Sequence, residues 1–466
     1  MLRRGPAGSP DEARAQFNGS VIRHDGKFKM WYIAADRAGI DSMKRNRPGN
    51  WRIAYAESTD GVHWVKPNLG LVEYRGSRDN NLVAVDPPDL YGFTLAVLHE
   101  PEAPDPGRRF KMMLLVQWDP GDGRRLSTSV PLWSADGLRW RLGAPARLHD
   151  SVVAKEDVVL PPEMFEQGGL YRWQGVYYLT GQQLQPWAWL ADGKRVGRTM
   201  TIFRSRDLVH WADTRSFSFV RYGYRSAPSG AGEESHLPAS VWHRGNVLVA
   251  LNGLFHGAPG APDQRKASHP IELGVLLSND GIQFREPVPD FVFLPLGDKG
   301  SWEGGGLLEA QAFENVGEET LVWYGGWDAD VYLQEVHADI GLARLRRDGF
   351  GALRVKNPAQ SGALVTCTLE AAGPVWLWAN ADGLGTDAWL RVELLDDAEQ
   401  PLAGYSGKEA AKLDRSGTHV ALVWGDSASA AVMRGRFRVR VSFEGAARGG
   451  IRLYALYLSS GDGAGR

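Results

Sequence analysis

Apolar and polar residues alternate along most of this chain, and the alternating runs come in pairs joined at a glycine. The clearest pair spans residues 20–32, where two runs flank Asp25 and Gly26. Further pairs lie at residues 95–115, 169–179, 240–251 and 312–324. Period-two alternation rich in aromatic and β-branched residues predicts β-hairpins. We therefore expect an all-β fold.

A short turn phrase follows each of these pairs. It has the form Ser-x-Asp with an aromatic residue four positions after the Asp, and its copies centre on Asp60, Asp136, Asp207 and Asp280, with a weaker one at Asp348. The copies recur roughly every 70 residues, as in repeat architectures. Asp-Gly supplies the positive φ that a tight hairpin needs. Two hairpins per repeat are the content of one propeller blade, so we predict a five-bladed β-propeller over residues 1–355.

The sequence changes character after Asp348. The turn phrase stops, and short alternating runs follow at residues 375–379, 389–395, 419–424, 436–443 and 451–458. Short strands of this kind predict a β-sandwich over residues 356–460. Residues 461–466 are rich in glycine, and we expect a disordered tail there.

Composition and charge narrow the classes of partner. The chain has 53 basic and 55 acidic residues, for a net charge of −2, so neither nucleic acid nor a membrane surface is expected as a partner. The single Cys367 is expected to be a buried, inert thiol. Residues 1–5 lack the apolar core of a signal peptide. Location stays open between the cytoplasm and secretion with a removed signal, and the oligomeric state is also open.

Carboxylates and amides gather where the innermost strands of a propeller would begin. Such strand starts converge on one central funnel. The residues at these positions are Gln16, Asn18, Asp89, Glu163, Glu166, Gln167, Glu233, Glu234, His236, Glu303, Glu309 and Gln311. Trp187, Trp189 and Trp327 flank the mouth. The polar residues of the last blade are Asp328, Asp330, His337 and Asp339, and residues 327–330 would form a rim loop there. Aromatic faces beside acids and amides suit sugars, so we expect an oligosaccharide or glycoside as partner.

The turn phrase, the blade openings and the trailing sandwich together resemble the five-bladed glycoside hydrolases of families 32, 43, 62, 68 and 117. Residues 64–74 with Asn80 and Asn81 resemble, more closely, uncharacterised bacterial proteins predicted to be family 32-like hydrolases. The resemblance implies a catalytic propeller that acts on a small or terminal, furanoside-type sugar. It also implies three carboxylates, from blades one, three and four, that serve as base or nucleophile, stabiliser and acid.

This chain departs from that pattern at two of the three positions. Aligned on the blade openings, the first acid would fall at Gln16 or Asn18 and the second at Gln167. An amide can neither accept a proton from water nor form a glycosyl ester. We therefore expect Glu233 or Glu234 as general acid, with Glu166 and Glu309 holding charge or activating water.

The sequence thus predicts a glycoside hydrolase that works by carboxylate acid–base catalysis in the funnel. The other polar and aromatic funnel residues would bind substrate, and no cofactor or catalytic metal is required. A catalytically silent carbohydrate-binding propeller is the main alternative, which the missing acids favour. A lyase or phosphorylase is a weaker third. Single funnel acids could instead be structural, bonding backbone N–H groups or holding a cation on the axis.

Overall fold

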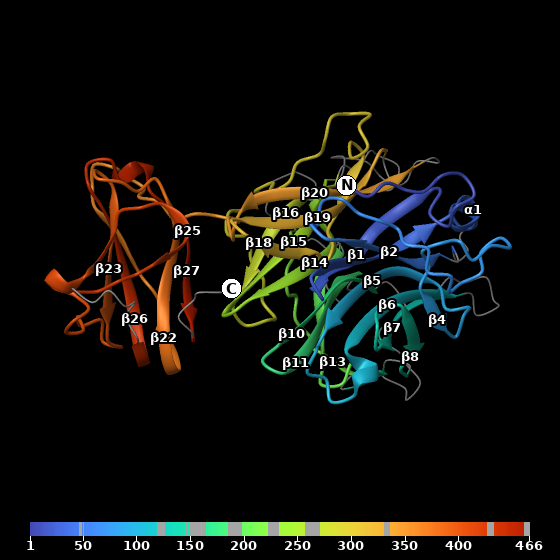
Figure 1. The fold of residues 1–466 in the computed structure, drawn as a ribbon, viewed down its shortest axis with the longest axis horizontal. Coiled ribbons are helices and arrows are strands. Elements are labelled where there is room, and N and C mark those ends of the chain that lie inside the picture. Colours follow the sequence, from blue (N-terminus) through green and yellow to red (C-terminus); the bar gives the residue numbers. More distant parts are fainter. Residues whose placement is uncertain are drawn as a thin grey trace, which may run out of the picture. The chain divides into compact units, whose positions relative to one another are not determined.

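The computed structural model describes residues 1–45, 49, 51–118, 126–144, 147–149, 160, 165–184, 198–221, 233–256, 271–329, 336–425 and 433–460. Over these ranges the chain is built almost entirely of strands (Figure 1), which confirms the all-β class. It divides into two compact units, Met1–Glu314 with Leu321–Ala343, and Asn315–Thr320 with Arg344–Arg466. The predicted tail lies outside the described residues. No helix in these ranges is long and apolar enough to span a membrane.

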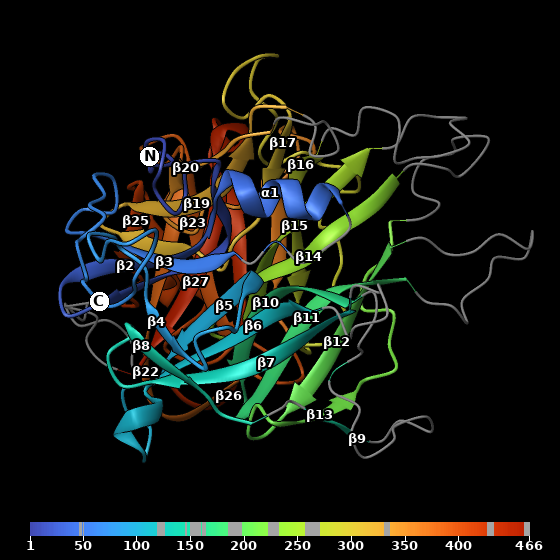
Figure 2. The ribbon, with the colours of Figure 1, turned by 90° about the vertical axis from the view of Figure 1, so that its right-hand side faces the viewer.

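The described strands of residues 14–346 form four sheets, in which most neighbouring strands are antiparallel and three pairs are parallel (Figure 2). One sheet has the order β17-β19-β20-β1-β2-β3, with β18 on β19, and contains β1 (Arg14–His24), β2 (Lys27–Ala35), β3 (Arg52–Ser58), β17 (Gly306–Leu308), β18 (Phe313–Val316), β19 (Glu319–Trp327) and β20 (Ala338–Arg346). The next has the order β4-β8-β7-β6-β5, from β4 (Ala84–Asp86), β5 (Gly92–His99), β6 (Phe110–Trp118), β7 (Leu126–Ser134) and β8 (Arg139–Leu142).

Two further sheets complete this unit. The third has the order β10-β11-β12-β13-β9, from β9 (Arg147–His149), β10 (Phe165–Trp173), β11 (Val176–Leu184), β12 (Arg198–Ser205) and β13 (His210–Asp213). The fourth is β14 (Glu233–Arg244), β15 (Val247–His256) and β16 (Ile271–Ser278). Helix α1 (Arg37–Lys44) follows β2, and a 3-10 turn spans Pro106–Arg108.

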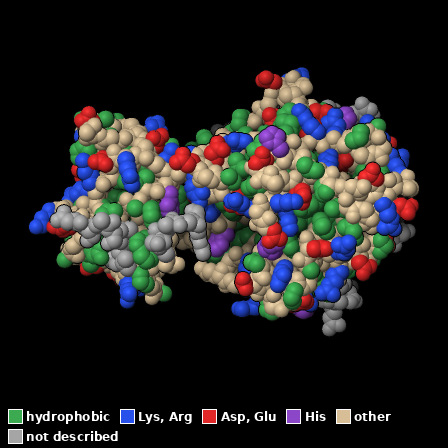
Figure 3. Space-filling model, viewed as in Figure 1, with side chains coloured by type: hydrophobic (Ala, Val, Ile, Leu, Met, Phe, Trp, Pro, Cys, Tyr) green, Lys and Arg blue, Asp and Glu red, His purple; other side chains and the backbone are tan. Residues whose placement is uncertain are grey.

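Acidic and basic side chains are interspersed on the face drawn in Figure 3.

Strands β1, β5, β10 and β14 are bulged near their starts. The register shifts between Gln16 and Ser20 in β1, between Gly92 and Thr94 in β5, between Gln167 and Gly169 in β10, and between His236 and Ser240 in β14. A bulge leaves backbone groups without a ladder partner and redirects the neighbouring side chains. The bulges in β1, β10 and β14 fall on strand starts that the sequence marked as candidate funnel positions, whereas the bulge in β5 lies beyond Asp89, the residue marked for that sheet.

The repeated turn phrase is a scaffold element. In the first copy the Ser58 hydroxyl accepts from the Gly61 N–H (2.9 Å), and Asp60 Oδ1 accepts from the next two N–H groups (2.8 Å each). The copies at Asp136, Asp207 and Asp280 repeat these bonds. At Gly137, where φ is +78°, a Cβ would lie 2.7 Å from the Trp31 ring, so only glycine fits.

Each of three turns is also bonded to an aromatic side chain from another part of the unit. Trp31 Nε1 donates to the Gly137 carbonyl (2.6 Å), and Trp323 Nε1 donates to the Gly61 carbonyl (2.8 Å). The Tyr171 hydroxyl donates to the Gly281 carbonyl (2.6 Å). The turn phrase therefore recurs because it joins one group of strands to the next.

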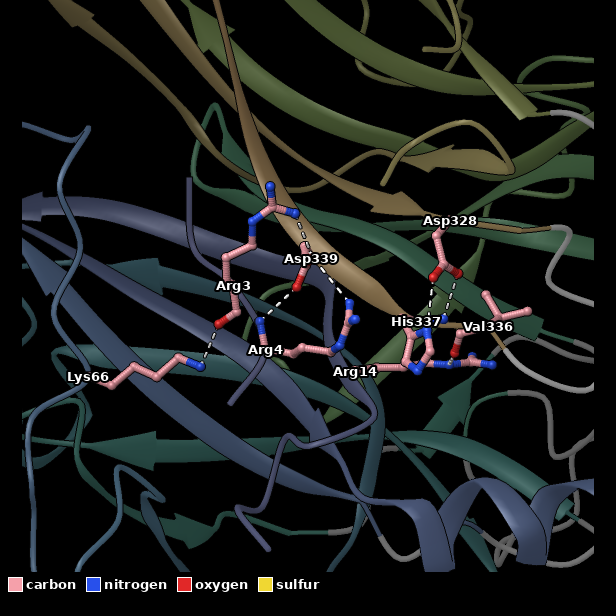
Figure 4. A network of polar contacts seen from close by, with 8 residues as sticks. All are labelled: Arg3, Arg4, Arg14, Lys66, Asp328, Val336, His337 and Asp339. Atoms are coloured by element: carbon pink, nitrogen blue, oxygen red, sulfur yellow. Dashed lines mark hydrogen bonds and ion pairs between the residues drawn. The ribbon is translucent and has the colours of Figure 1, made fainter. Parts of the chain in front are cut away.

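The N-terminal residues pair with the last strand of this unit. Leu2 and Ile340 exchange both backbone hydrogen bonds (3.0 and 2.9 Å), and Arg14 pairs with Ala338 in parallel. Asp339 accepts from the Arg4 N–H (2.7 Å) and from the Arg3 guanidinium (2.9 Å), as Figure 4 shows. Residues more than 300 positions apart in the sequence thus close the first unit.

Polar side chains join the bulged strands to one another. The Gln311 amide bonds both the N–H (3.1 Å) and the carbonyl of Val241, while its backbone bonds Gly19 (2.9 Å) and Val21 (3.2 Å). The Thr180 hydroxyl donates to the Ala239 carbonyl (2.6 Å). Gly19 and Ala239 lie within the bulges of β1 and β14, and Val21 and Val241 follow those bulges directly, so these bonds satisfy backbone groups that the strand ladders leave free.

The second unit has one sheet network and one core. Its strands are β21 (Gly362–Val365), β22 (Leu369–Asp382), β23 (Trp389–Leu395), β24 (Ala411–Leu413), β25 (Gly417–Ala421), β26 (Met433–Glu444) and β27 (Arg452–Ser459), in the order β24-β23-β26-β22-β25, with β21 on β26 and β27 on β22. Two 3-10 turns span Gly407–Glu409 and Arg448–Gly450. Leu377, Leu390 and Val439 lie among its fully buried residues.

Two expectations for this unit differ from the structure. The unit takes in the chain from Arg344, earlier than the predicted boundary after residue 355, because Arg346 Nε donates to Asn380 Oδ1 (2.7 Å) and the Tyr457 hydroxyl donates to Asp348 (2.8 Å). Cys367 is exposed rather than buried, since it lies on the connection between β21 and β22 and not within a strand.

Replacing Gln311 by leucine is expected to destabilise the first unit. The change leaves the N–H and the carbonyl of Val241 without partners, each at a cost of about 1–3 kcal/mol. Urea unfolding followed by tryptophan fluorescence measures the effect, and the exposed Gln283→Leu is the matched control. Equal unfolding midpoints for the two variants would contradict the structural role of Gln311.

Candidate functional site

Candidate residues from different sheets meet at the start of β14. Glu166 of β10 accepts a hydrogen bond from Gln182 Nε2, and Gln182 Oε1 accepts from the Leu237 N–H (3.0 Å). On the other side, Gly253 pairs with His236, and a Cβ on Gly253 would lie 3.2 Å from Glu309 Oε2. Both carboxyl groups therefore flank the segment at His236 and Leu237. The backbone of Glu233 and Glu234 forms the beginning of the same strand, but their side chains lie outside the described residues.

The bulge in β14 fixes the ring of His236. Leu237 has a φ of +44°, an unusual conformation for a residue with a branched side chain, and the bond from Gln182 holds it there. The imidazole stacks on Phe255, with ring centroids 6.1 Å apart, and meets the edge of Trp327 at 6.2 Å. Backbone strain of this kind is typical of functional sites.

Glu309 presents a carboxyl group that is buried completely. Its side chain has no exposed surface, and neither carboxyl oxygen has a hydrogen-bond partner among the described residues. Burial raises the pKa of Glu309 well above its ordinary value of 4.5, because the buried site disfavours the charged carboxylate and favours the protonated acid. Gly253 leaves room for the carboxyl, and Asn18 Nδ2 donates to the Glu309 carbonyl (3.3 Å). A carboxylic acid kept neutral in this way is able to donate a proton.

The end of β19 adds a second polar group next to this cluster. Trp327 is buried, and within the described ranges its indole Nε1 has no partner. Asp328 follows and accepts from both the backbone N–H and the Nδ1 of His337 (2.8 Å each), as Figure 4 shows. Because the carboxylate is the acceptor, Nδ1 carries a proton and Nε2 faces away from Asp328.

Arg14 lies beside this pair and was missed by the sequence analysis. Its Nε donates to the Val336 carbonyl (3.0 Å) and its NH1 to Gln16 Oε1 (3.4 Å), while its guanidinium carbon lies 6.0 Å from the centre of the Trp51 ring. Burial lowers the pKa of Arg14 to about 10, an effect that Asp328 opposes. Arg14 and Gln16 share one face of β1, so extending the period-two pattern back by two residues would have found it.

Two predicted sugar ligands are used by the scaffold. Gln167 Nε2 donates to the Met113 carbonyl (2.7 Å), and its Oε1 accepts from the Ser129 hydroxyl (2.7 Å). The Gln311 amide is likewise occupied by the backbone of Val241. Of the positions where the resemblance implies an acid, Gln16 holds Arg14 and Gln167 joins two sheets.

The remaining predicted ligands do not join the cluster. Glu303 accepts a hydrogen bond from the Tyr324 hydroxyl (2.6 Å). The pKa of Tyr324 is raised, mainly by burial of the phenol and next by this contact with Glu303. Asp89 is exposed in the loop before β5. Its neighbours Pro88 and Leu90 line a cavity of about 330 Å³ that shares no lining residue with the cluster. Glu163, Trp187 and Trp189 lie outside the described residues. In the part of the chain described, no group of three or more His, Cys, Asp or Glu is placed to hold a metal ion.

Comparison with known proteins gives similarity in structure only. No family model matches the chain, and no curated protein does. A glycosyl hydrolase from Bacteroides ovatus is 15% identical, with a TM-score of 0.46, over 74% of this chain and 94% of that one. An N-acetylgalactosamine deacetylase from F. plautii is 18% identical, with a TM-score of 0.47, over 74% and 95%. The family 32 β-fructofuranosidase of Bombyx mori is 11% identical, with a TM-score of 0.44, over 98% and 93%. The predicted similarity to glycoside hydrolases, family 32 included, is found among these structures.

Glu309→Gln is expected to change how stability depends on pH. Below the ordinary pKa of 4.5 the folded and unfolded chains both hold this proton, and above it only the folded chain does. Wild-type stability therefore falls as pH rises, by up to about 1.4 kcal/mol per pH unit, and the variant escapes this loss. Urea midpoints of both proteins from about pH 4 to about pH 8 measure the growing difference. A constant difference, matching that of the exposed Glu319→Gln, would contradict a protonated Glu309.

Proposed function

We propose that the first unit is a five-bladed β-propeller and the second a β-sandwich. The bulged leading strands, the four matching turns and the pairing of Leu2 with Ile340 support a closed ring of blades. In this arrangement β17 to β20 are the fifth blade, which meets the first at Arg14 and Ala338. The single core of the second unit fits two packed sheets.

We further propose that the protein is a glycoside hydrolase, and that the protonated carboxyl of Glu309 is its general acid. Cleavage of a glycosidic bond needs a proton for the departing oxygen, and a carboxylic acid with a raised pKa supplies it. Burial beside His236 gives Glu309 this property. This observation carries the proposal and moves the acid role from Glu233 or Glu234 to Glu309.

The neighbouring groups have complementary roles in this reaction. Glu166, held by Gln182, is the carboxylate that activates water or stabilises the positively charged sugar ring. The indole N–H of Trp327 is free to donate to a sugar hydroxyl, and the ring of His236 forms part of the wall. By the sequence resemblance, we propose a small or terminal sugar of the furanoside type as substrate.

The effect on kcat of removing the acidic proton at residue 309 is expected to depend on the leaving group of the substrate. With methyl or disaccharide furanosides, Glu309→Gln should lower kcat by about 10²–10⁴-fold, the usual contribution of a general acid. With nitrophenyl furanosides, whose leaving group departs without a proton, the loss should be much smaller. Steady-state kinetics on arabinofuranosides and fructofuranosides measure both values.

The exposed Glu319→Gln is the control and should keep wild-type activity. Equal losses with both kinds of leaving group would contradict the acid role of Glu309. A wild-type protein that binds sugars but cleaves none of these glycosides would contradict the hydrolase.

A further inference from the structure

Arg14 is a buried cation that forms no ion pair in the described part of the chain. Its side chain is 7% exposed, and no Asp or Glu of the described residues forms an ion pair with it. Asp328 is near enough to affect its charge, but both oxygens of Asp328 accept from His337. An unpaired buried charge costs far more than a paired one, and proteins rarely keep it without a use.

A second buried arginine shows what the same scaffold does when the charge is structural. Arg221 is 1% exposed, and it is paired with Asp290 (3.2 Å) and Glu286 (3.8 Å). Arg14 instead bonds a backbone carbonyl and the neutral amide of Gln16. The two sites have similar burial, so the missing carboxylate is specific to Arg14.

The guanidinium keeps donors for another group. The guanidinium has five N–H bonds. One on Nε donates to Val336 and one on NH1 donates to Gln16, and the others have no partner in the described ranges. His337, next to Val336, turns Nε2 away from Asp328 (Figure 4). The planar fork of an arginine matches a carboxylate, which accepts two parallel N–H bonds.

We propose that Arg14 binds the carboxylate of an acidic sugar, so that this protein takes uronic acids. The cleavage of uronic acid glycosides rests on the proposed function, whereas the binding does not. The location favours a sugar over an inorganic anion. Gln16 and Asn18, at the same end of β1, offer amides, and Asn18 contacts Glu309. The Trp51 ring beside the guanidinium offers an aromatic face.

Calorimetric titration with glucuronate and galacturonate, and with glucose and galactose as neutral counterparts, tests the binding. Wild type should bind the uronates at least about tenfold more tightly than the neutral sugars. Arg14→Met should lose this preference, Arg14→Lys should retain part of it, and the exposed Arg139→Met should retain all of it. Equal binding of uronates and neutral sugars, or undiminished preference in Arg14→Met, would overturn the proposal.

Phosphate and sulfate form a separate arm of the titration. If either binds through Arg14 while the uronates do not, the site takes an inorganic anion and the acidic-sugar proposal is overturned. The hydrolase is tested independently. Uronate binding without cleavage of any glycoside would contradict the proposed hydrolase and support the uronate site. Cleavage of neutral furanosides without a preference for uronates would support the hydrolase and contradict the uronate site.

Thermal stability separates a binding role from a structural one. Because Arg14 forms no ion pair with a described residue, Arg14→Met should leave Tm unchanged or raise it, whereas Arg221→Met should lower Tm by removing the guanidinium that Asp290 and Glu286 contact. A fall in Tm for Arg14→Met as large as that for Arg221→Met would identify Arg14 as structural and overturn the proposal. If Arg14→Met does not fold, the comparison of uronates with neutral sugars on wild type decides.

Discussion

The bulged strand starts impose one constraint on the whole first unit: backbone groups that leave the β-ladder deep inside the protein must find partners in a neighbouring sheet. Amides and hydroxyls meet this need. The Thr180 hydroxyl binds the carbonyl of Ala239 within the β14 bulge, and the backbone amide of Gln311 binds the carbonyl of Gly19 within the β1 bulge. Without these bonds the bulges of β1 and β14 would bury unpaired polar groups.

The same constraint distinguishes polar side chains that hold the fold together from those available for binding or catalysis. Most polar side chains at the centre are satisfied by backbone, so they have no capacity left for a ligand. Glu309 and Arg14 differ, because each is buried with hydrogen-bonding or charge capacity unused in the described residues. Buried groups of this kind destabilise a fold, and they persist where a function requires them. One is neutral and acidic and the other is cationic, a pairing that suits proton transfer to a substrate bearing negative charge.

Much of this arrangement follows from the sequence, because local patterns specify it. Alternation placed the hairpins, and the Ser-x-Asp phrase placed turns whose bonds repeat in four copies. The strand starts then led to Glu166, His236 and Glu309, which the structure brings together.

The uses of individual polar residues did not follow from the sequence. A glutamine that joins two sheets and one that binds a sugar are identical in sequence, so Gln167 and Gln311 could not be told from ligands. Arg14 escaped notice because its importance lies in burial without an ion pair among the described residues, a property of three-dimensional neighbours that no spacing reveals.

The pairing of Leu2 with Ile340 has a consequence for how the chain acquires this fold. On the ribosome the first residues are made long before β20, so they wait unpaired while the intervening sheets form. Contacts of such large sequence separation form late, because closing the loop between them costs entropy that only the finished sheets offset. Synthesis must pass residue 340 before these two segments are able to pair, and until then the strand edges of β1 and β20 that later meet stay unpaired with each other.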